Sequence, residues 1–207
     1  MWKGETCLLS FTLRETPRYA TGLAAMVLSV RFMYQADSLP LLFASIFLFI
    51  ACATDTFISQ IPNPLNLTLL LAGFFYHGST TGTTGVLTAF LGMLLGFALL
   101  IVPHLLGGMG AGDVKALAAL GALMGPWGIL HTFIYIGLAG GIMAILHYAF
   151  THNLKQKFLQ GLYALKVFSY TNDIRNIKPS CDERLRFPYA AAIAFGFFAY
   201  IHWGRLL

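Results

Sequence analysis

Long apolar runs recur along almost the whole chain and are separated by shorter polar stretches. Seven of these runs reach or approach the roughly 20 residues that a helix needs to cross a bilayer. They cover residues 20–34, 41–57, 65–76, 86–106, 114–124, 129–150 and 189–203. The third and fifth runs are shorter than a full span, so we expect their polar flanks to lie inside protein or at a wet surface. The pattern predicts an all-α polytopic membrane protein with about seven transmembrane helices, within a range of roughly six to eight.

The composition agrees with a membrane protein. Of the 207 residues, 57% are hydrophobic and 10% are charged, whereas about 25% of the residues of a soluble domain are charged. We therefore expect one membrane domain over residues 1–207, with a basic loop at residues 151–187 and a final transmembrane helix at residues 188–204. Residues 154–168 of the loop carry apolar side chains on one helical face, which fits either a helix lying flat on the membrane or a plain connector.

Lysine and arginine indicate the orientation of the helices. With the N-terminus in the cytoplasm, 11 of the 13 basic residues fall on the cytoplasmic side, as the positive-inside rule requires. The opposite connections, residues 77–85 and 125–128, contain no lysine or arginine. We predict a cytoplasmic N-terminus and a cytoplasmic loop whose positive charge faces anionic lipid.

Glycine, proline and asparagine mark several helix ends and contacts. Asn63 before Pro64 predicts a helix start with Asn63 as the N-cap, and Gly125 is expected to end the fifth helix. Glycines four residues apart fit close contacts between helices in lipid. These pairs are Gly92 with Gly96, Gly121 with Gly125, and Gly137 with Gly141.

Two of the eight acidic residues, Asp55 and Asp113, lie at the edges of apolar runs. The other six fall in polar tails or loops and need no special explanation. Ionisable residues in or near membrane spans are functional candidates by default. In the predicted topology one helix ends near Asp55 at the inner side and another begins there with Asp113, so both carboxyls are expected at one membrane face and at similar depth.

Two carboxyls about 4 Å apart cannot both ionise easily, because their repulsion at an effective dielectric of 20 is about 4 kcal/mol. They would share one proton, as in aspartic proteases, where one carboxylate takes a proton from water and its protonated partner polarises the scissile carbonyl. We expect Gly110 and Gly112 to give the backbone before Asp113 conformations closed to other residues and to let a substrate strand approach. The alternative is that Asp113 merely caps a helix.

Two motifs together carry a family resemblance: DTFISQIPN at residues 55–63 and GAGDVK at residues 110–115. Over roughly residues 41–150 the chain resembles the type IV prepilin peptidases of the Gly-x-Gly-Asp intramembrane aspartyl protease class. The resemblance implies that Asp55 and Asp113 are the catalytic acids. It implies supporting roles for the other motif residues, among which Lys115 either tunes a carboxylate or meets lipid phosphate; these residues are Pro62, Asn63, Gly110, Gly112 and Lys115.

The resemblance also implies the reaction and its setting. It indicates an enzyme of the bacterial inner membrane that needs no cofactor and cuts a basic leader from prepilins or pseudopilins after a glycine at the cytoplasmic face. Its expected partners are that substrate and membrane lipid, and its oligomeric state is left open. The paired C-x-x-C motifs of the longer, methylating members do not occur in this chain. It is therefore more similar to the short, peptidase-only members that serve Flp-type pili.

Other functions fit the sequence less well. A presenilin-like protease shares Gly-x-Gly-Asp, but Thr54 stands where that family has tyrosine, and no Pro-Ala-Leu triplet occurs. An ion-coupled carrier tends to place its acids near the midplane and to show repeated halves, and a scaffold subunit of a secretion system leaves both acid motifs unexplained. His131 and His147 do not lie on one helical face, so their spacing does not indicate a pair of metal ligands. No nucleotide or nucleic-acid binding motif is present.

Overall fold

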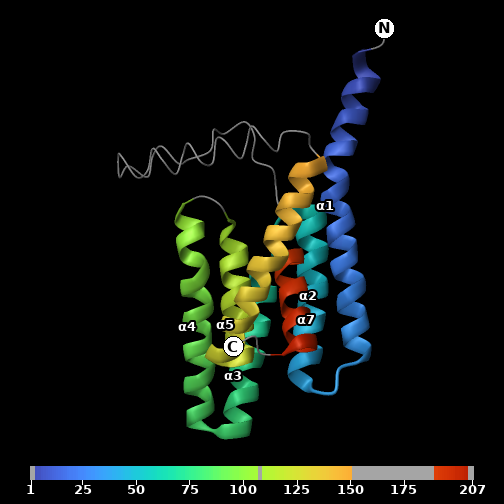
Figure 1. Cartoon of the computed structure of the whole chain (residues 1–207). Coiled ribbons are helices and arrows are strands. Elements are labelled where there is room, and N and C mark those ends of the chain that lie inside the picture. Colours follow the sequence, from blue (N-terminus) through green and yellow to red (C-terminus); the bar gives the residue numbers. More distant parts are fainter. Residues whose placement is uncertain (1–2, 107–108, 151–188, 205–207) are drawn as a thin grey trace, which may run out of the picture.

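The computed structural model describes residues 3–106, 109–150 and 189–204, with side chains for residues 18–106, 109–146 and 189–204. This part of the chain consists of helices joined by short turns and contains no strand. Figure 1 shows its helices, which are α1 (Lys3–Tyr34), α2 (Leu39–Ile58), α3 (Asn63–Thr81), α4 (Thr83–Leu105), α5 (Ala111–Phe150) and α7 (Tyr189–Trp203). The expected all-α class is confirmed for the described residues. The amphipathic segment expected at residues 154–168 lies outside them.

Within the described residues, three helices are long and apolar enough to cross a membrane: Leu39–Ile58, Thr83–Leu105 and Ala111–Leu146. The protein is therefore a membrane protein. The last helix, Tyr189–Trp203, is apolar but has only 15 residues. The bundle does not establish seven spans, and that number remains a prediction.

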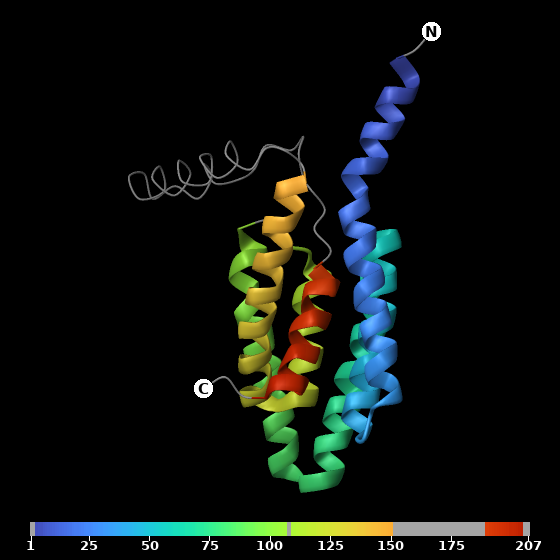
Figure 2. The ribbon, with the colours of Figure 1, turned by 45° about the vertical axis from the view of Figure 1, so that its right-hand side comes forward.

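The α5 helix reverses its direction part of the way along. Gly125 has φ 74° and ψ 175°, which lies outside the helical region and is open mainly to glycine. Figures 1 and 2 show the chain descending before this point and climbing back after it. The break expected at Gly125 and Pro126 is confirmed, and it returns the end of α5 toward the end of the bundle at which this helix starts.

The connection predicted at residues 77–85 is wrong in detail, because most of it is helical. The α3 helix runs to Thr81 and α4 begins at Thr83, so Gly82 with φ 66° makes the turn. The hydroxyls of Thr80 and Thr81 donate to carbonyls one turn earlier, at Tyr76 and His77. These hydroxyls find hydrogen-bond acceptors on the helix itself, so a polar stretch is compatible with a helix that continues beyond its apolar run.

Glycines bring α4 against the first half of α5. A methyl group added to Gly92 would lie 2.1 Å from the backbone oxygen of Gly121, and one added to Gly96 would lie 2.5 Å from that of Leu117. Backbones this close exclude any larger residue, as in other helix contacts in lipid. The contact predicted for Gly137 and Gly141 is wrong for the described part of the chain, because an added methyl there meets none of its atoms within 4 Å.

The interior of the bundle lies around the first half of α5, α7 and the inner face of α2. Leu48, Leu117, Leu120 and Phe198 are buried there. The α5 helix packs most extensively on α4, and α7 fits between α5 and the pair α1–α2. This packing fixes one end of the bundle, where α2 ends and α5 and α7 begin (Figure 2).

Candidate active site

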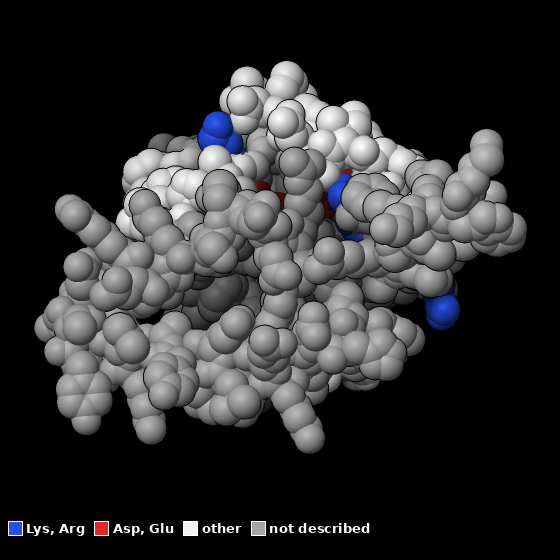
Figure 3. Space-filling model, turned by 90° about the horizontal axis from the view of Figure 1, so that it is seen from above, with Lys and Arg blue, Asp and Glu red and all other residues white. Residues whose placement is uncertain are grey.

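The two aspartates singled out by the sequence lie at this shared end. Asp55 is half-buried in the last turn of α2, and Asp113 is 7% exposed in the first turn of α5. The charge of Asp55 acts on the Asp113 carboxyl, so the two groups are electrostatic neighbours. Figure 3 looks onto this end and shows acidic side chains recessed below the surface, with basic side chains close by. The arrangement meets the expectation that both carboxyls lie at one end of the bundle.

Asp113 is held by its own helix. The backbone N–H of Gly110 donates to its Oδ2 over 3.2 Å, and the N–H of Asp113 donates back to the Gly110 carbonyl over 3.2 Å. Since α5 begins at Ala111, Asp113 is its third residue and Gly110 takes the N-cap position. Asp113 is therefore not an N-cap residue; it supplies the acidic half of a capping box. A carboxylate in this position is also favoured by the helix dipole.

Asp55 is held by two other helices. Its Oδ2 accepts the N–H of Ala190 over 3.2 Å, at the second residue of α7. Its backbone carbonyl accepts Nη2 of Arg18, from α1, over 2.7 Å and the N–H of Ser59 over 3.0 Å. The carboxylate thus stands where an N-cap side chain of α7 would stand. Neither Arg18 nor Ala190 was singled out by the sequence motifs.

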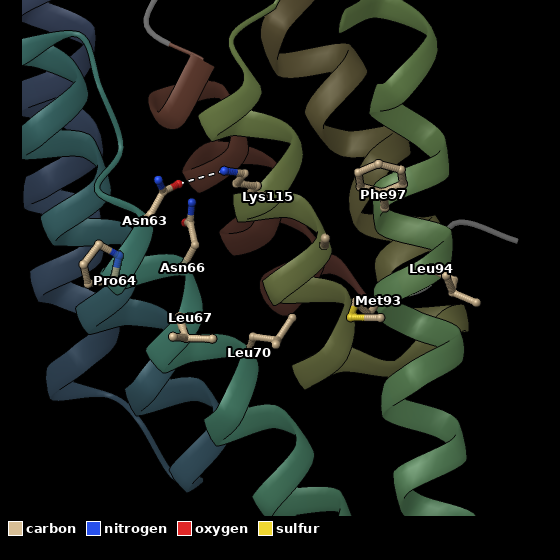
Figure 4. A pocket seen from close by; sticks show the side chains of 10 residues that line it. Asn63, Pro64, Asn66, Leu67, Leu70, Met93, Leu94, Phe97 and Lys115 are labelled. Atoms are coloured by element: carbon tan, nitrogen blue, oxygen red, sulfur yellow. Dashed lines mark hydrogen bonds between the residues drawn. The ribbon is translucent and has the colours of Figure 1, made fainter.

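The turn after Asp55 docks on the start of α5. Lys115 Nζ donates to Asn63 Oδ1 over 2.9 Å, and Asn66 Nδ2 donates to the Gly112 carbonyl over 3.4 Å. Figure 4 shows the Lys115–Asn63 bond. The predicted capping role of Asn63 is wrong, because Pro62 takes the N-cap position and no side chain caps α3. The two sequence motifs are therefore joined directly, through Asn63 and Lys115.

The predicted backbone role of the two motif glycines is also wrong. Among described residues, glycines with positive φ are Gly82, Gly125 and Gly204, and neither Gly110 nor Gly112 is one of them. The reason is that α5 starts at Ala111, which makes Gly112 an ordinary helical residue. Close approach remains: a methyl added to Gly110 would lie 3.2 Å from Oδ2 of Asp113, and one added to Gly112 would lie 3.4 Å from Cβ of Ile61.

A largely apolar groove with a volume of about 580 Å³ adjoins these motifs between α3, α4 and the first half of α5. Figure 4 shows its walls and, at one end, the polar side chains of Asn63 and Lys115. Asn66 is 4% exposed and also lines the groove, and its Oδ1 has no hydrogen-bond partner among the described residues. The apolar wall is formed by Leu67, Leu70, Met93, Leu94, Phe97 and Ala118.

His104 is a further neighbour of Asp113 that the motifs did not reveal. It lies at the end of α4, within electrostatic range of the Asp113 carboxyl, and its Nδ1 is 3.0 Å from the Met109 carbonyl. A histidine at the end of an apolar helix offers little sequence signal of its own. Among described residues, no group of three or more histidine, cysteine or acidic side chains is placed to hold a metal ion.

Comparison with known proteins supports one assignment. The model of the type IV leader peptidase family matches residues 42–145, half of the 207-residue chain. Neither a search of curated proteins nor a search of solved structures gave a match. The matched region contains both acid motifs and the groove, while Arg18 and Ala190 lie outside it.

Proposed function

Because the chain belongs to the type IV leader peptidase family, we propose that it is a membrane aspartic endopeptidase that removes the basic leader from a prepilin or pseudopilin. The observation that supports this most is the position of the two acids at one end of the bundle, with Asp55 in the last turn of α2 and Asp113 in the first turn of α5, within electrostatic range of each other. Two carboxyls that approach each other in a partly water-excluded place favour a state in which they share one proton.

The reaction follows from that shared proton. The ionised carboxyl takes a proton from water while the oxygen of that water forms a bond to the carbonyl carbon of the scissile peptide. The protonated carboxyl donates its proton to the carbonyl oxygen, so that no full negative charge builds up there. When the C–N bond breaks, the carboxyl that took the water proton gives it to the leaving amine, which becomes the N-terminus of the mature subunit, and the other carboxylate takes a proton from the collapsing gem-diol. Water is consumed, and the pair returns to its starting state with one proton.

The site residues have different roles in this proposal. Asp55 and Asp113 perform the proton transfers. Lys115 and Asn63 join the turn after α2 to α5, and Gly110 orients Asp113 through its amide. Pro62 and Gly112 belong to the same connection, Pro62 as the N-cap of α3 and Gly112 as the acceptor of the Asn66 bond.

We place the reaction at the cytoplasmic face of the bacterial inner membrane, with a cytoplasmic N-terminus and about seven spans in a single domain. The distribution of lysine and arginine supports this orientation. The cut follows a glycine, and no cofactor is needed. We further propose Flp-type substrates and no methyltransferase activity, because the paired C-x-x-C motifs of the methylating members do not occur in this sequence.

Co-expression with a prepilin from the same genome tests the proposal. We expect the prepilin to lose its leader, and mass spectrometry of the product to give an unmethylated N-terminus that follows the leader glycine. A prepilin that keeps its leader beside protein verified as folded in the membrane would contradict the proposal. That result would favour an ion-coupled carrier or a scaffold subunit.

A further inference from the structure

We propose that Arg18 of α1 is a positioning residue of the peptidase site, which holds the end of α2 and with it Asp55. This inference rests on the proposed function and extends it to a helix outside the region that the family model matches. Arg18 does not belong to either acid motif.

The contacts of Arg18 lie where α2 ends. Nη2 donates to the backbone carbonyl of Asp55 over 2.7 Å and also donates to Oγ of Ser59. The positive charge of Arg18 acts on the Asp55 carboxyl as well. Charged donors at this distance are among the stronger hydrogen bonds in proteins. A cation at a helix C-terminus also complements the helix dipole.

Burial shows that this arginine has a specific place in the bundle. Arg18 is 8% exposed, whereas arginine is almost never buried without partners because desolvating its charge is costly. The guanidinium has five donors in a fixed planar array, so it can serve several acceptors at once where lysine has a single ammonium. A buried arginine on a backbone carbonyl beside a candidate acid therefore fits positioning better than surface charge.

The packing of α1 on α2 fixes the register of Arg18. One turn after Arg18, a methyl added to Gly22 would lie 2.1 Å from Oγ1 of Thr56, the residue next to Asp55. The rings of Tyr19 and Phe57 lie 6.3 Å apart. Because α1 touches α2 this closely at the two residues that follow Asp55, the guanidinium cannot shift along α2 without losing packing.

Ser59 needs the support that Arg18 gives. It has φ 59° and is the only residue other than glycine with positive φ among those described. This left-handed conformation ends α2 and is normally taken by glycine. The bond from Arg18 to its hydroxyl holds the residue there. Arg18 therefore bonds to the last turn of α2 at two places, the Asp55 carbonyl and the Ser59 hydroxyl.

Arg18→Met tests the proposal in the purified full-length protein, with cleavage of a prepilin measured over a range of substrate concentrations. We expect kcat to fall about 10- to 100-fold, because a displacement of about 1 Å in a catalytic group can cost that much. KM should change little, since the guanidinium bonds to Asp55 and Ser59 at the end of α2, and neither of these residues lines the groove. Arg18→Lys should recover part of kcat, and Ser59→Gly, which keeps the turn but removes the hydroxyl, should lower kcat by a smaller factor.

Arg31→Met is the matched control, because Arg31 lies in the last turn of the same helix and is exposed. It should behave like the unaltered protein. Arg18→Met with unchanged kcat, or with its loss confined to KM, would overturn the proposal. If Arg18→Met does not fold, Arg18→Lys and Ser59→Gly decide, and unchanged kcat in both would overturn it. Cleavage retained by Asp55→Asn would instead refute the proposed function, so the two failures are distinguishable.

Discussion

The two candidate acids are held in opposite ways. Asp113 takes its hydrogen bond from Gly110, three residues away on the same helix start. Asp55 takes its support from Arg18 and Ala190, which are 37 and 135 residues away. One carboxyl is therefore placed by local helix geometry, and the other by the packing of three helices. Asp113 keeps its environment wherever α5 begins correctly, whereas Asp55 depends on α1 and α7 as well.

Removing either carboxyl should have the largest effect, and an equal one, despite this difference. Asp55→Asn and Asp113→Asn should each lower cleavage by about 1000-fold or more, because general acid and base catalysis contributes up to roughly 10⁴-fold. The measurement is kcat/KM on a purified prepilin. Asp37→Asn is the control, since Asp37 is exposed in the turn between α1 and α2. Substantial cleavage by either variant would remove that residue from the mechanism.

Loss of the backbone N–H of Ala190, which donates to Asp55, should have the next largest effect. Ala190→Pro removes the N–H that donates to Asp55, and proline is tolerated in the first turn of a helix. We expect kcat to fall about tenfold or more, as for a hydrogen bond to a charged group worth about 1.5–3 kcal/mol. Ala190→Gly keeps the amide and should retain most of kcat. Equal losses in the two variants would mean that the side chain of Ala190 matters and the amide does not.

A change at the local contact should have the smallest effect of the three. Gly110→Ala keeps the amide but places a methyl 3.2 Å from Oδ2 of Asp113, a distance that a small rotation of the carboxyl relieves. We expect kcat to fall by a factor of about 2–5, equivalent to roughly 0.4–1 kcal/mol. Gly137→Ala, where an added methyl meets nothing within 4 Å, should leave kcat unchanged. A loss at Gly110 as large as that at Ala190 would show that the local support is equally sensitive.

The same contrast between local and long-range contacts explains how much could be predicted from the sequence. Apolar runs predicted the helices, and the reversal at Gly125 followed from glycine and proline, since these signals are local. The polar stretch at residues 77–85 was misread because serine and threonine can remain in a helix when their hydroxyls bond to its own carbonyls. The capping role expected for Asn63 failed for a different reason: its side chain is engaged by Lys115, 52 residues away.

The candidate site likewise contains residues that the sequence motifs indicated and residues that they did not. The motifs indicated Asp55 and Asp113 and their supporting residues, and the structure joins those motifs through Asn63 and Lys115. Arg18 looked like one of several basic residues before the first span, and Ala190 contributes only a backbone amide. Neither side chain type nor spacing distinguishes such residues. Their role depends on how α1 and α7 pack, which one sequence does not reveal.

The pH dependence of kcat/KM for prepilin cleavage tests the central claim most directly. If Asp55 and Asp113 work as a pair with one proton, activity requires one carboxyl ionised and the other protonated. We predict a maximum, with activity falling toward acid as the second proton binds and toward alkali as the shared proton is lost. A rate that stays flat across the range where the protein remains folded would contradict a coupled pair.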